Sequence, residues 1–451
     1  MSDPPSAGSG LEQWLDYQQG THSHTIDLSL ERIRAVAARL GLLERRRAVA
    51  IVGGTNGKGS TATALAGLLH ACGWRTGLFT SPHLVQYNER VRIDGAAVAD
   101  EALVSAFEAI EAARGAITLT YFEYSTLAAL ELFRRAEVDA MVLEVGLGGR
   151  LDATNILDAD VAVLCSVGLD HRDWLGDTLE QIGAEKAGIF RPGQNVVIGS
   201  AEMPGSVWRR LEQLQCRVHR PQHEFDWHIE HGEGHGDDAD LDGGGAGSAG
   251  GAGYAGEPWQ YRSAGCTLED LPAPALPGAI QYGNAAAALT ALQLLGAPHA
   301  CDPAPVAAAL RALRLPGRLQ IVPGPVEWVL DVAHNEAAAE VLAAALRARP
   351  IAGRTIAVAS LLADKDAAAV TRALDALVDH WVLAGVNDEP RGLSAEAFAA
   401  RLPPLRGACE LASTVAVACE RARSQARPGD RIVAMGSFHV VRPALQWLGL
   451  Y

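Results

Sequence analysis

Short apolar runs alternate along the chain with longer segments in which apolar residues recur every three or four positions. The runs at 49–52, 76–79, 140–143, 161–167 and 195–198 predict strands, because short continuous apolar runs are typical of strands buried in a parallel sheet. The periodic segments predict helices, at 11–17, 29–43, 61–72, 100–113, 182–190 and in a stretch that ends at 135. This alternation predicts an α/β fold. The polar segment 85–94 is expected to form a mobile loop.

A second, shorter series of the same kind follows a linker rich in proline and small residues. Strands at 328–330, 356–359, 381–383 and 431–434 alternate with helices and predict a smaller doubly wound unit. We therefore expect a domain at 1–296, a linker at 297–303 and a second domain at 304–451. Near 231–256 histidines and acids give way to almost pure glycine and alanine, which predicts a mobile excursion. Its histidines could instead bind a metal.

The apolar run at 49–52 ends in a glycine-rich turn, Gly-Gly-Thr-Asn-Gly-Lys-Gly-Ser at 53–60. Glycines let successive backbone N–H groups converge on an anion, Lys58 offers a positive charge to the outer phosphates, and Ser60 can bind the accompanying metal. The spacing departs from the standard P-loop, which would need a glycine at Val52 and a hydroxyl at Gly59. The turn could also be only a tight connection from a strand to a helix.

Polar residues stand at the ends of further predicted strands, where ligands collect in open α/β sheets. Ser81 follows the strand at 76–79, and Glu144 ends the next strand beside a glycine-rich loop, as a magnesium ligand facing phosphates would. A solvated loop glutamate is the alternative. His171 follows the strand at 161–167 and is either a ligand or a structural histidine. Lys186 lies among small and apolar neighbours and could be functional or form a surface ion pair.

The second domain has one comparable cluster, Asp331 with His334, after the strand at 328–330. These residues mark a ligand-binding edge by the same topological argument. The charged segment 364–366 could contribute there or form a solvated turn.

Composition limits the classes of function. The 451 residues carry a formal charge of −15, which argues against nucleic acid as a partner and requires local cations for any anionic substrate. No apolar run reaches the length of a membrane span, and the acidic first thirty residues do not form a signal peptide, so we expect a cytoplasmic protein. The seven scattered cysteines are expected to be reduced thiols.

Taken in order, these motifs resemble the folylpolyglutamate synthase family of the Mur ligase superfamily, and more closely its bacterial bifunctional dihydrofolate synthase/folylpolyglutamate synthases. The resemblance covers nearly the whole chain, and the phosphate-loop spacing is the family's own variant. The segments that carry it lie at 54–60, 81–84, 121–123, 144–155, 185–189 and 331–335.

The resemblance implies a larger N-terminal P-loop-type Mur ligase ATPase domain and a smaller C-terminal Rossmann-like domain. It implies an ATP-dependent amide ligase that joins L-glutamate to dihydropteroate, and to the glutamate tail of reduced folates, through an acyl phosphate. Two magnesium sites and a monomeric state are implied with it, as is a potassium dependence that no local motif indicates.

The family's site residues carry over to matching positions. The catalytic set implied is Lys58, Glu144, His171, Lys186 and His334. The nucleotide contacts implied are Gly54, Thr55, Asn56, Gly57, Lys58, Gly59, Ser60, Asn284, Arg318 and Asp331. The metal ligands implied are Ser60, Ser81, Glu144, His171 and Lys186, the lysine being carboxylated in the family. The pterin contacts implied are Asp27, Leu28, Ser29, Leu30, Thr120, Tyr121, Phe122, Glu123, Leu151, Asp152 and Ala153.

Two other functions are compatible with parts of this pattern. A Mur-type ligase acting on a cell-wall precursor or cyanophycin would share the phosphate loop, although the segments 121–123 and 151–153 favour a folate. A nucleotide-binding regulatory protein without catalysis is disfavoured because Lys58, Glu144, His171 and Lys186 are all present.

Overall fold

The computed structural model describes residues 4–6, 8–44, 47–230 and 256–451. It divides into two compact units. The first comprises the described residues of Met1–His228, Trp259–Pro272 and Gly283–Leu313, and the second those of Ile229–Pro258, Ala273–Tyr282 and Arg314–Tyr451. The excursion predicted near 231–256 lies outside the described residues except for Gly256. No helix in the described ranges has the length and apolar character needed to cross a bilayer.

The first unit is built on an eight-stranded sheet in the order β4-β3-β2-β5-β1-β6-β7-β8. The strands from β2 to β8 along this order are parallel, while β3 and β4 extend the sheet antiparallel. The strands are β1 (Ala48–Gly53), β2 (Thr76–Phe79), β3 (Val91–Ile93), β4 (Ala96–Ala97), β5 (Ala140–Glu144), β6 (Val161–Leu164), β7 (Asn195–Ile198) and β8 (Arg217–His219).

Helices cover both faces of this sheet. They are α1 (Leu11–Gln19), α2 (Glu31–Arg39), α3 (Lys58–Ala71), α4 (Asp100–Arg114), α5 (Tyr121–Arg135), α6 (Arg172–Leu175), α7 (Leu179–Lys186), α8 (Gly205–Gln213), α9 (Ile280–Leu294) and α10 (Pro303–Ala312). One core joins apolar residues of α1, α2, α4, α5 and α8 to alternate residues of the strands. Helix α3 contacts β1, β2 and β5 without contributing to that core, so it covers the opposite face, with α10 packed against it.

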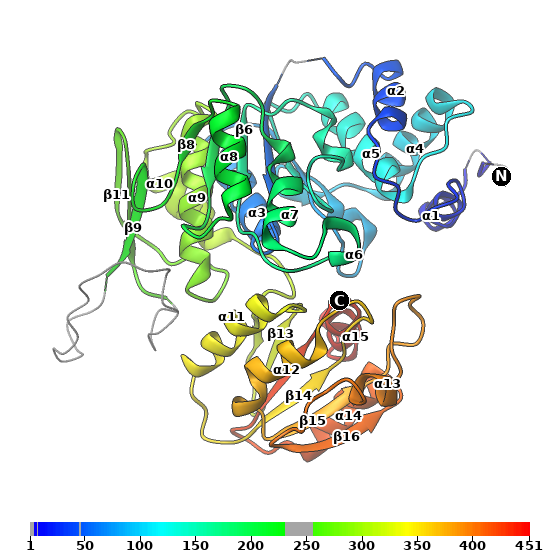
Figure 1. Cartoon of the computed structure of the whole chain (residues 1–451), viewed down its shortest axis with the longest axis vertical. Coiled ribbons are helices and arrows are strands. Elements are labelled where there is room, and N and C mark those ends of the chain that lie inside the picture. The colour runs from blue at the N-terminus through cyan, green and yellow to red at the C-terminus, as the bar shows by residue number, and fades with distance from the viewer. Residues whose placement is uncertain (1–3, 7, 45–46, 231–255) are drawn as a thin grey trace. The chain divides into compact units, whose positions relative to one another are not determined.

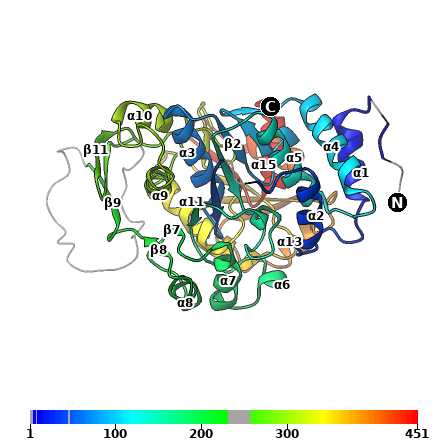
Figure 2. The same cartoon turned by 90° about the horizontal axis from the view of Figure 1, so that it is seen from above.

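The two ends of the first unit differ. Helices α1, α2, α4 and α5 gather at one end in both views, and the antiparallel sheet of β9 (Phe225–Ile229), β10 (Trp259–Ser263) and β11 (Cys266–Leu271) lies at the other, beside α9 and α10 (Figures 1 and 2). A disulfide joins Cys266 to Cys301, with Cα atoms 5.7 Å apart. The prediction that all seven cysteines are free thiols is therefore wrong for this pair, which is separated by 35 residues in the sequence.

The second unit contains a six-stranded sheet in the order β12-β13-β17-β14-β15-β16, with only β12 antiparallel. Its strands are β12 (Gln320–Val322), β13 (Glu327–Asp331), β14 (Thr355–Ala359), β15 (His380–Ala384), β16 (Ala408–Ala412) and β17 (Arg431–Met435). Its helices are α11 (Glu336–Arg347), α12 (Ala367–Leu374), α13 (Ala395–Ala399), α14 (Val415–Gln425) and α15 (Phe438–Trp447). The α/β prediction is confirmed for both units.

Two local expectations need correction. The linker expected at 297–303 lies within the first unit, whose last segment ends at Leu313, because α10 packs on α3 and Asp302 caps α10 by accepting a hydrogen bond from Ala304 N at 3.2 Å. The loop expected at 85–94 instead forms a 3₁₀ helix, Tyr87–Arg90, followed by β3. Both Tyr87 and Arg90 are buried, so the polar sequence of this segment is misleading.

Candidate active site

The phosphate loop joins β1 to α3 as the sequence predicts. Gly57 has φ +86°, and a Cβ atom there would lie 3.0 Å from Asn284 Oδ1 at the start of α9, so both the backbone and the space require glycine. Thr61 Oγ1 donates to the same Oδ1 at 3.4 Å. Lys58 Nζ donates to Thr55 O at 3.1 Å across the loop. The structure thus brings Asn284, distant in sequence, to the phosphate loop.

The ends of the two strands beside this loop supply a carboxylate and a hydroxyl residue. In the parallel register Glu144 pairs with Val52, the last strand position before the loop's glycines. The backbone N–H of Ser81, just after β2, donates to Glu144 Oε2 at 3.0 Å. Glu144 is buried, as is Ser60 in the first turn of α3. Ser81 and Glu144 are therefore adjacent, as expected for residues at one edge of a parallel sheet.

Lys186, the last residue of α7, is a buried amine that reaches the phosphate loop. Its Nζ donates to Gly54 O at 2.9 Å. Burial, with a further contribution from the charge of Lys58, lowers the pKa of Lys186 to about 7, against the opposing influence of Asp170. An amine with such a pKa is substantially neutral near pH 7, and a neutral amine is a nucleophile.

Cys165, the residue after β6, is a buried thiol that senses these charges. Burial raises the pKa of the Cys165 thiol to about 11, and the thiol interacts electrostatically with the charges of Lys58, Glu144 and Lys186. The three predicted residues therefore all lie within electrostatic reach of this thiol. His171 follows the same strand with φ +51°, and its Nε2 lies 3.9 Å from Asp170 Oδ2.

Two of the three predicted pterin-binding segments are joined by an arginine that the sequence analysis did not select. Arg32 Nη1 donates to Asp27 Oδ2 at 2.9 Å, and Arg32 Nη2 lies 3.3 Å from Glu123 Oε1. Glu123 also closes a capping box at the start of α5, where its Oε2 accepts from Thr120 N at 2.7 Å. Burial raises the pKa of Glu123. Arg32 thus holds the segment that begins at Asp27 beside the first turn of α5.

The third predicted pterin-binding segment, 151–153, is linked to the first turn of α5 through Asp152, the glycine-rich loop after β5 and Phe122. A Cβ atom on Gly146 would lie 2.6 Å from Phe122 Cζ, so the glycine-rich loop after β5 packs directly on this ring. Asp152 Oδ2 accepts from Gly146 N at 3.0 Å, and from the next amide in the chain at 2.9 Å. Its Oδ1 accepts from Thr154 N at 3.0 Å and from Thr154 Oγ1 at 2.6 Å. Asp152 therefore fixes the conformation of the loop that carries the third predicted segment.

An aromatic and cationic cluster lies beside the first turn of α5. The guanidinium of Arg90 lies 5.4 Å from the ring centre of Tyr87 and 5.5 Å from that of Tyr121. Arg90 Nε donates to His83 Nδ1 at 2.8 Å. Of these residues, only Tyr121 was among the predicted contacts, because the others belong to the segment interpreted as a mobile loop or border it.

The remaining predicted residues lie in the second unit, at the carboxyl edge of its sheet. Asp331 ends β13, and its two carboxylate oxygens accept from Leu319 N and Ala333 N, each at 2.7 Å. Burial raises the pKa of Asp331. Arg318 lies over the ring of Phe438 at 5.2 Å, and His334 Nδ1 lies 2.9 Å from Val332 O.

Comparison with known proteins identifies the family. The Mur ligase middle domain matches residues 52–224, and the glutamate ligase domain of Mur ligases matches residues 317–438. The dihydrofolate synthase/folylpolyglutamate synthase of Escherichia coli is 41% identical over 98% of this chain and 96% of its own length, and that of Haemophilus influenzae is 38% identical over 96% and 97%. The chain belongs to the dihydrofolate synthase/folylpolyglutamate synthase family of Mur ligases.

Solved structures of this family share the fold. The structure of E. coli FolC in complex with DHPP and ADP matches with a TM-score of 0.87 over 99% of both chains. A bifunctional folylpolyglutamate synthase/dihydrofolate synthase with Mn, AMPPNP and L-glutamate bound matches with a TM-score of 0.85 and 38% identity, over 99% of this chain and 100% of the other.

The scarcity of lysine in the sequence singles out two site residues, Lys58 and Lys186, without any argument from the family. This member of the family has only three lysines among its 38 basic residues, Lys58, Lys186 and Lys365. Arginine carries a delocalised charge with a pKa above about 12 and cannot supply a neutral amine. In so arginine-rich a chain, each lysine is a candidate for a role that arginine cannot fill.

Proposed function

We propose that the chain is an ATP-dependent ligase that joins L-glutamate to dihydropteroate, forming dihydrofolate, and to the glutamate tail of reduced folates. The observation that carries the proposal is the placement of Lys58, Glu144 and Lys186 at the phosphate loop, where Lys186 Nζ donates to Gly54 O and Glu144 pairs with Val52 in the strand register. The relatives' names, and the ADP, AMPPNP and L-glutamate bound in the matching structures, support the choice of substrates.

The chemistry explains why these charges are needed. A carboxylate is a poor electrophile, so its oxygen first attacks the γ-phosphorus of ATP, forming an acyl phosphate and releasing ADP. The α-amine of glutamate then attacks the acyl carbon, and the tetrahedral intermediate expels phosphate and loses a proton to give the amide. Both steps crowd anions together, and Lys58 with the loop's backbone N–H groups would offset that repulsion.

The residues at the strand ends fit a divalent metal. Glu144 offers a buried carboxylate beside the phosphate loop, and Ser81 is in contact with it. We propose that Ser60, Ser81 and Glu144 hold one magnesium ion and that His171 and Lys186 hold a second. Magnesium would neutralise phosphate oxygens as their charge develops.

The ammonium form of Lys186 cannot bind a cation, and magnesium prefers oxygen ligands to the nitrogen of a neutral amine. A neutral amine adds to the carbon of CO₂ and releases a proton, which leaves an anionic carbamate with two oxygen ligands. The pKa of about 7, which results mainly from burial, supports this modification, as does the lysine's position against Gly54. Carboxylation of Lys186 is therefore part of the proposal.

The pterin end of the substrate is proposed to contact the three segments at 27–30, 120–123 and 151–153. Their connection through Arg32 and through the packing of Phe122 on Gly146 supports one binding surface. The carboxylate oxygens of Asp152 each already accept two hydrogen bonds, so the backbone beside it is a better candidate for contact than its side chain. Asn284, Arg318, Asp331 and His334 are proposed as nucleotide contacts or near neighbours.

A candidate site for the carboxylate of the incoming glutamate lies in the second unit. Ser360 follows β14 and Ser437 follows the neighbouring strand β17, where Ser437 precedes α15 without capping it. Both hydroxyls are buried, and neither has a hydrogen-bond partner among the described residues. The Ser437 hydroxyl stands at the N-terminus of α15, and unpaired hydroxyls beside a helix N-terminus suit an anion. We propose that they bind a glutamate carboxylate.

The test is to incubate the purified chain with ATP, magnesium, glutamate and either dihydropteroate or a reduced folate, and to identify the products by mass. Glutamate-extended products that depend on both substrates are expected. Activity on a nucleotide-linked peptide instead would favour a cell-wall ligase, and ATP turnover without any ligation would contradict the proposal. A potassium requirement, a monomeric state and a cytoplasmic location stay predictions.

A further inference from the structure

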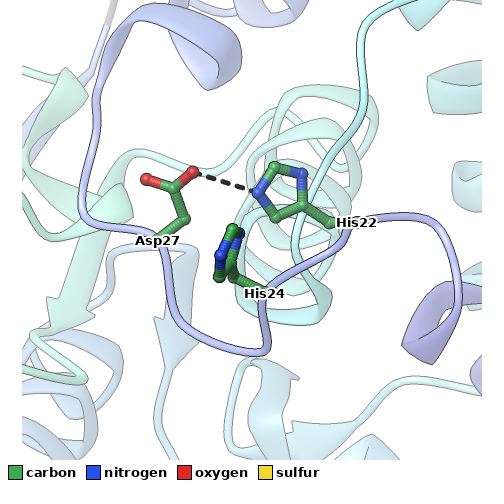
Figure 3. Close-up of side chains that lie close together, drawn as sticks. All are labelled: His22, His24 and Asp27. Carbon is green, nitrogen blue, oxygen red and sulfur yellow. Dashed lines mark hydrogen bonds and ion pairs between the residues drawn. The ribbon is translucent and has the colours of Figure 1, made fainter.

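The loop between α1 and α2 carries three metal-binding side chains that the proposed reaction does not use together. His22, His24 and Asp27 each offer one ligand atom, and these atoms lie within 4.8 Å of one another (Figure 3). Within the described ranges this is the one group of three His, Cys, Asp or Glu side chains found to meet that criterion. His22 Nε2 is already 3.0 Å from Asp27 Oδ2. Ligand atoms around a tetrahedral zinc lie roughly 3.3 Å apart, as bond lengths near 2.0 Å require.

The surroundings of His22 match those of a metal-binding imidazole. Its other nitrogen, Nδ1, lies 2.9 Å from Thr118 Oγ1. Histidines that bind metals commonly donate the second ring N–H to such an oxygen, which fixes the ring and frees the first nitrogen for the metal. When the metal binds, it replaces the proton on His22 Nε2 and with it the hydrogen bond to Asp27 Oδ2.

The other two residues can complete the site with little rearrangement. Among the described residues, hydrogen bonds reach only Oδ2 of Asp27, so its Oδ1 is open while Arg32 stays on Oδ2. His24 is exposed and lies in a segment without helix or strand, and its Nδ1 lies 3.0 Å from the neighbouring Ser23 Oγ, its hydrogen-bond partner among the described residues. The ring therefore has room to turn toward the other two, and solvent gives a metal direct access.

We propose that His22, His24 and Asp27 form a binding site for a divalent transition metal of the zinc, nickel or copper class, with at least one coordination position left to water. Two imidazoles and one carboxylate favour these ions over magnesium or calcium, which prefer sites made only of oxygen. The site is separate from the magnesium ligands proposed above.

Metal binding here has a consequence for the substrate, which rests on the proposed function. Asp27 begins the segment proposed to contact the pterin, and Arg32 ties it to Glu123. A cation at Asp27 weakens its attraction to Arg32 and changes the placement of residues 27–30. The metal therefore acts as an inhibitor that competes with dihydropteroate and leaves the affinity for ATP unchanged.

The direct test measures binding without any reaction. The full chain, stripped with a chelator and held in excess Mg²⁺, is titrated with Co²⁺ and followed by its visible absorption, and with Zn²⁺ by calorimetry. His24→Ala removes one proposed ligand. The matched control is His299→Ala, which removes another exposed histidine whose Nδ1 lies 3.9 Å from Asp302 Oδ2. The His24→Ala variant is expected to bind one equivalent fewer than the unchanged chain, and the His299→Ala variant the same number. Equal stoichiometry in all three proteins, or equal loss in both variants, would overturn the proposal.

A kinetic test then addresses the consequence. Zinc at one equivalent above the stoichiometric point is expected to raise the KM for dihydropteroate about tenfold in the unchanged chain, and less than twofold in His24→Ala. A rise of the same size in both proteins would refute the competition. If no ligase activity is found at all, the proposed function fails while the metal stoichiometry still decides the site.

Discussion

The carboxyl edges of the two sheets share a parallel topology but present different chemical groups to a ligand. In the first unit, charged side chains are buried together beside the phosphate loop, where Lys186 contacts Gly54 and interacts with Lys58. In the second unit, the carboxylate of Asp331 is occupied by backbone amides, and the hydroxyls of Ser360 and Ser437 are among the buried groups left without described partners. Concentrated charge suits a metal and a triphosphate, whereas neutral donors at a helix N-terminus suit one carboxylate.

The first prediction removes charge from the first unit. Lys58→Ala or Glu144→Ala is expected to lower turnover by about 10³-fold or more, because each removes a group that offsets the charge of the reacting phosphates. ADP release dependent on glutamate and dihydropteroate measures this, and circular dichroism checks the fold. Arg209→Ala, which removes an exposed cation that has no proposed role, is the control and should retain full activity. Full turnover by either site variant would contradict the assignment.

The second prediction tests whether Lys186 acts as a carbamate. Lys186→Ala is expected to lower activity up to about 10²-fold through the loss of an anionic ligand, with partial recovery when a short carboxylic acid is added. Lys186→Arg keeps a positive charge, fills the space and should not be recovered. Labelled bicarbonate should give a carbamate signal in the carbon NMR spectrum of the unchanged chain and not of Lys186→Ala. Equal signals in the two proteins would exclude the modification.

How far the sequence predicts the site depends on whether the contacts are local. The phosphate loop follows from adjacent residues, and the positions of Ser81 and Glu144 follow from the rule that parallel strands end at one edge. Arg90 could not be predicted, because its burial depends on the rings of Tyr87 and Tyr121, and its own segment looks solvated. Arg32 was missed for a related reason, since its partner Glu123 is distant in sequence.

The position expected for the domain linker differs from the structure for the same reason, because it depends on contacts between residues distant in sequence. Proline and small residues at 297–303 are typical of a linker, but nothing in that segment reveals that α10 packs on α3 or that Cys301 pairs with Cys266. The sequence likewise could not predict that the hydroxyls of Ser360 and Ser437 are buried without described partners. That state depends on residues from two neighbouring strands of the folded sheet.

The third prediction tests the neutral donors of the second unit. Ser437→Ala or Ser360→Ala is expected to raise the KM for glutamate about tenfold, because each removes one hydrogen bond to a charged carboxylate. Stability should not fall, since the hydroxyl has no described partner to lose. The control is Ser394→Ala, whose hydroxyl caps α13 by accepting from Ala397 N at 3.2 Å. That change should lower the free energy of unfolding by about 1 kcal/mol and leave the KM unchanged. A Ser437 variant that is destabilised with an unchanged KM would show a purely structural role.

The last prediction concerns Asp331, whose carboxylate is held by backbone amides of the second unit. Its carboxylate accepts from Leu319 N and Ala333 N at 2.7 Å, so Asp331→Asn would turn an amide NH₂ toward one of these donors. The variant is expected to lose about 1 to 2 kcal/mol of unfolding free energy, because one buried backbone N–H is left without an acceptor. Denaturant unfolding measures this change. The KM for ATP is measured on the same protein. A KM that rises by more than the loss of unfolding free energy accounts for would mean that the carboxylate also contacts the nucleotide. An unchanged unfolding free energy would mean that the two hydrogen bonds to backbone amides do not stabilise this edge of the sheet.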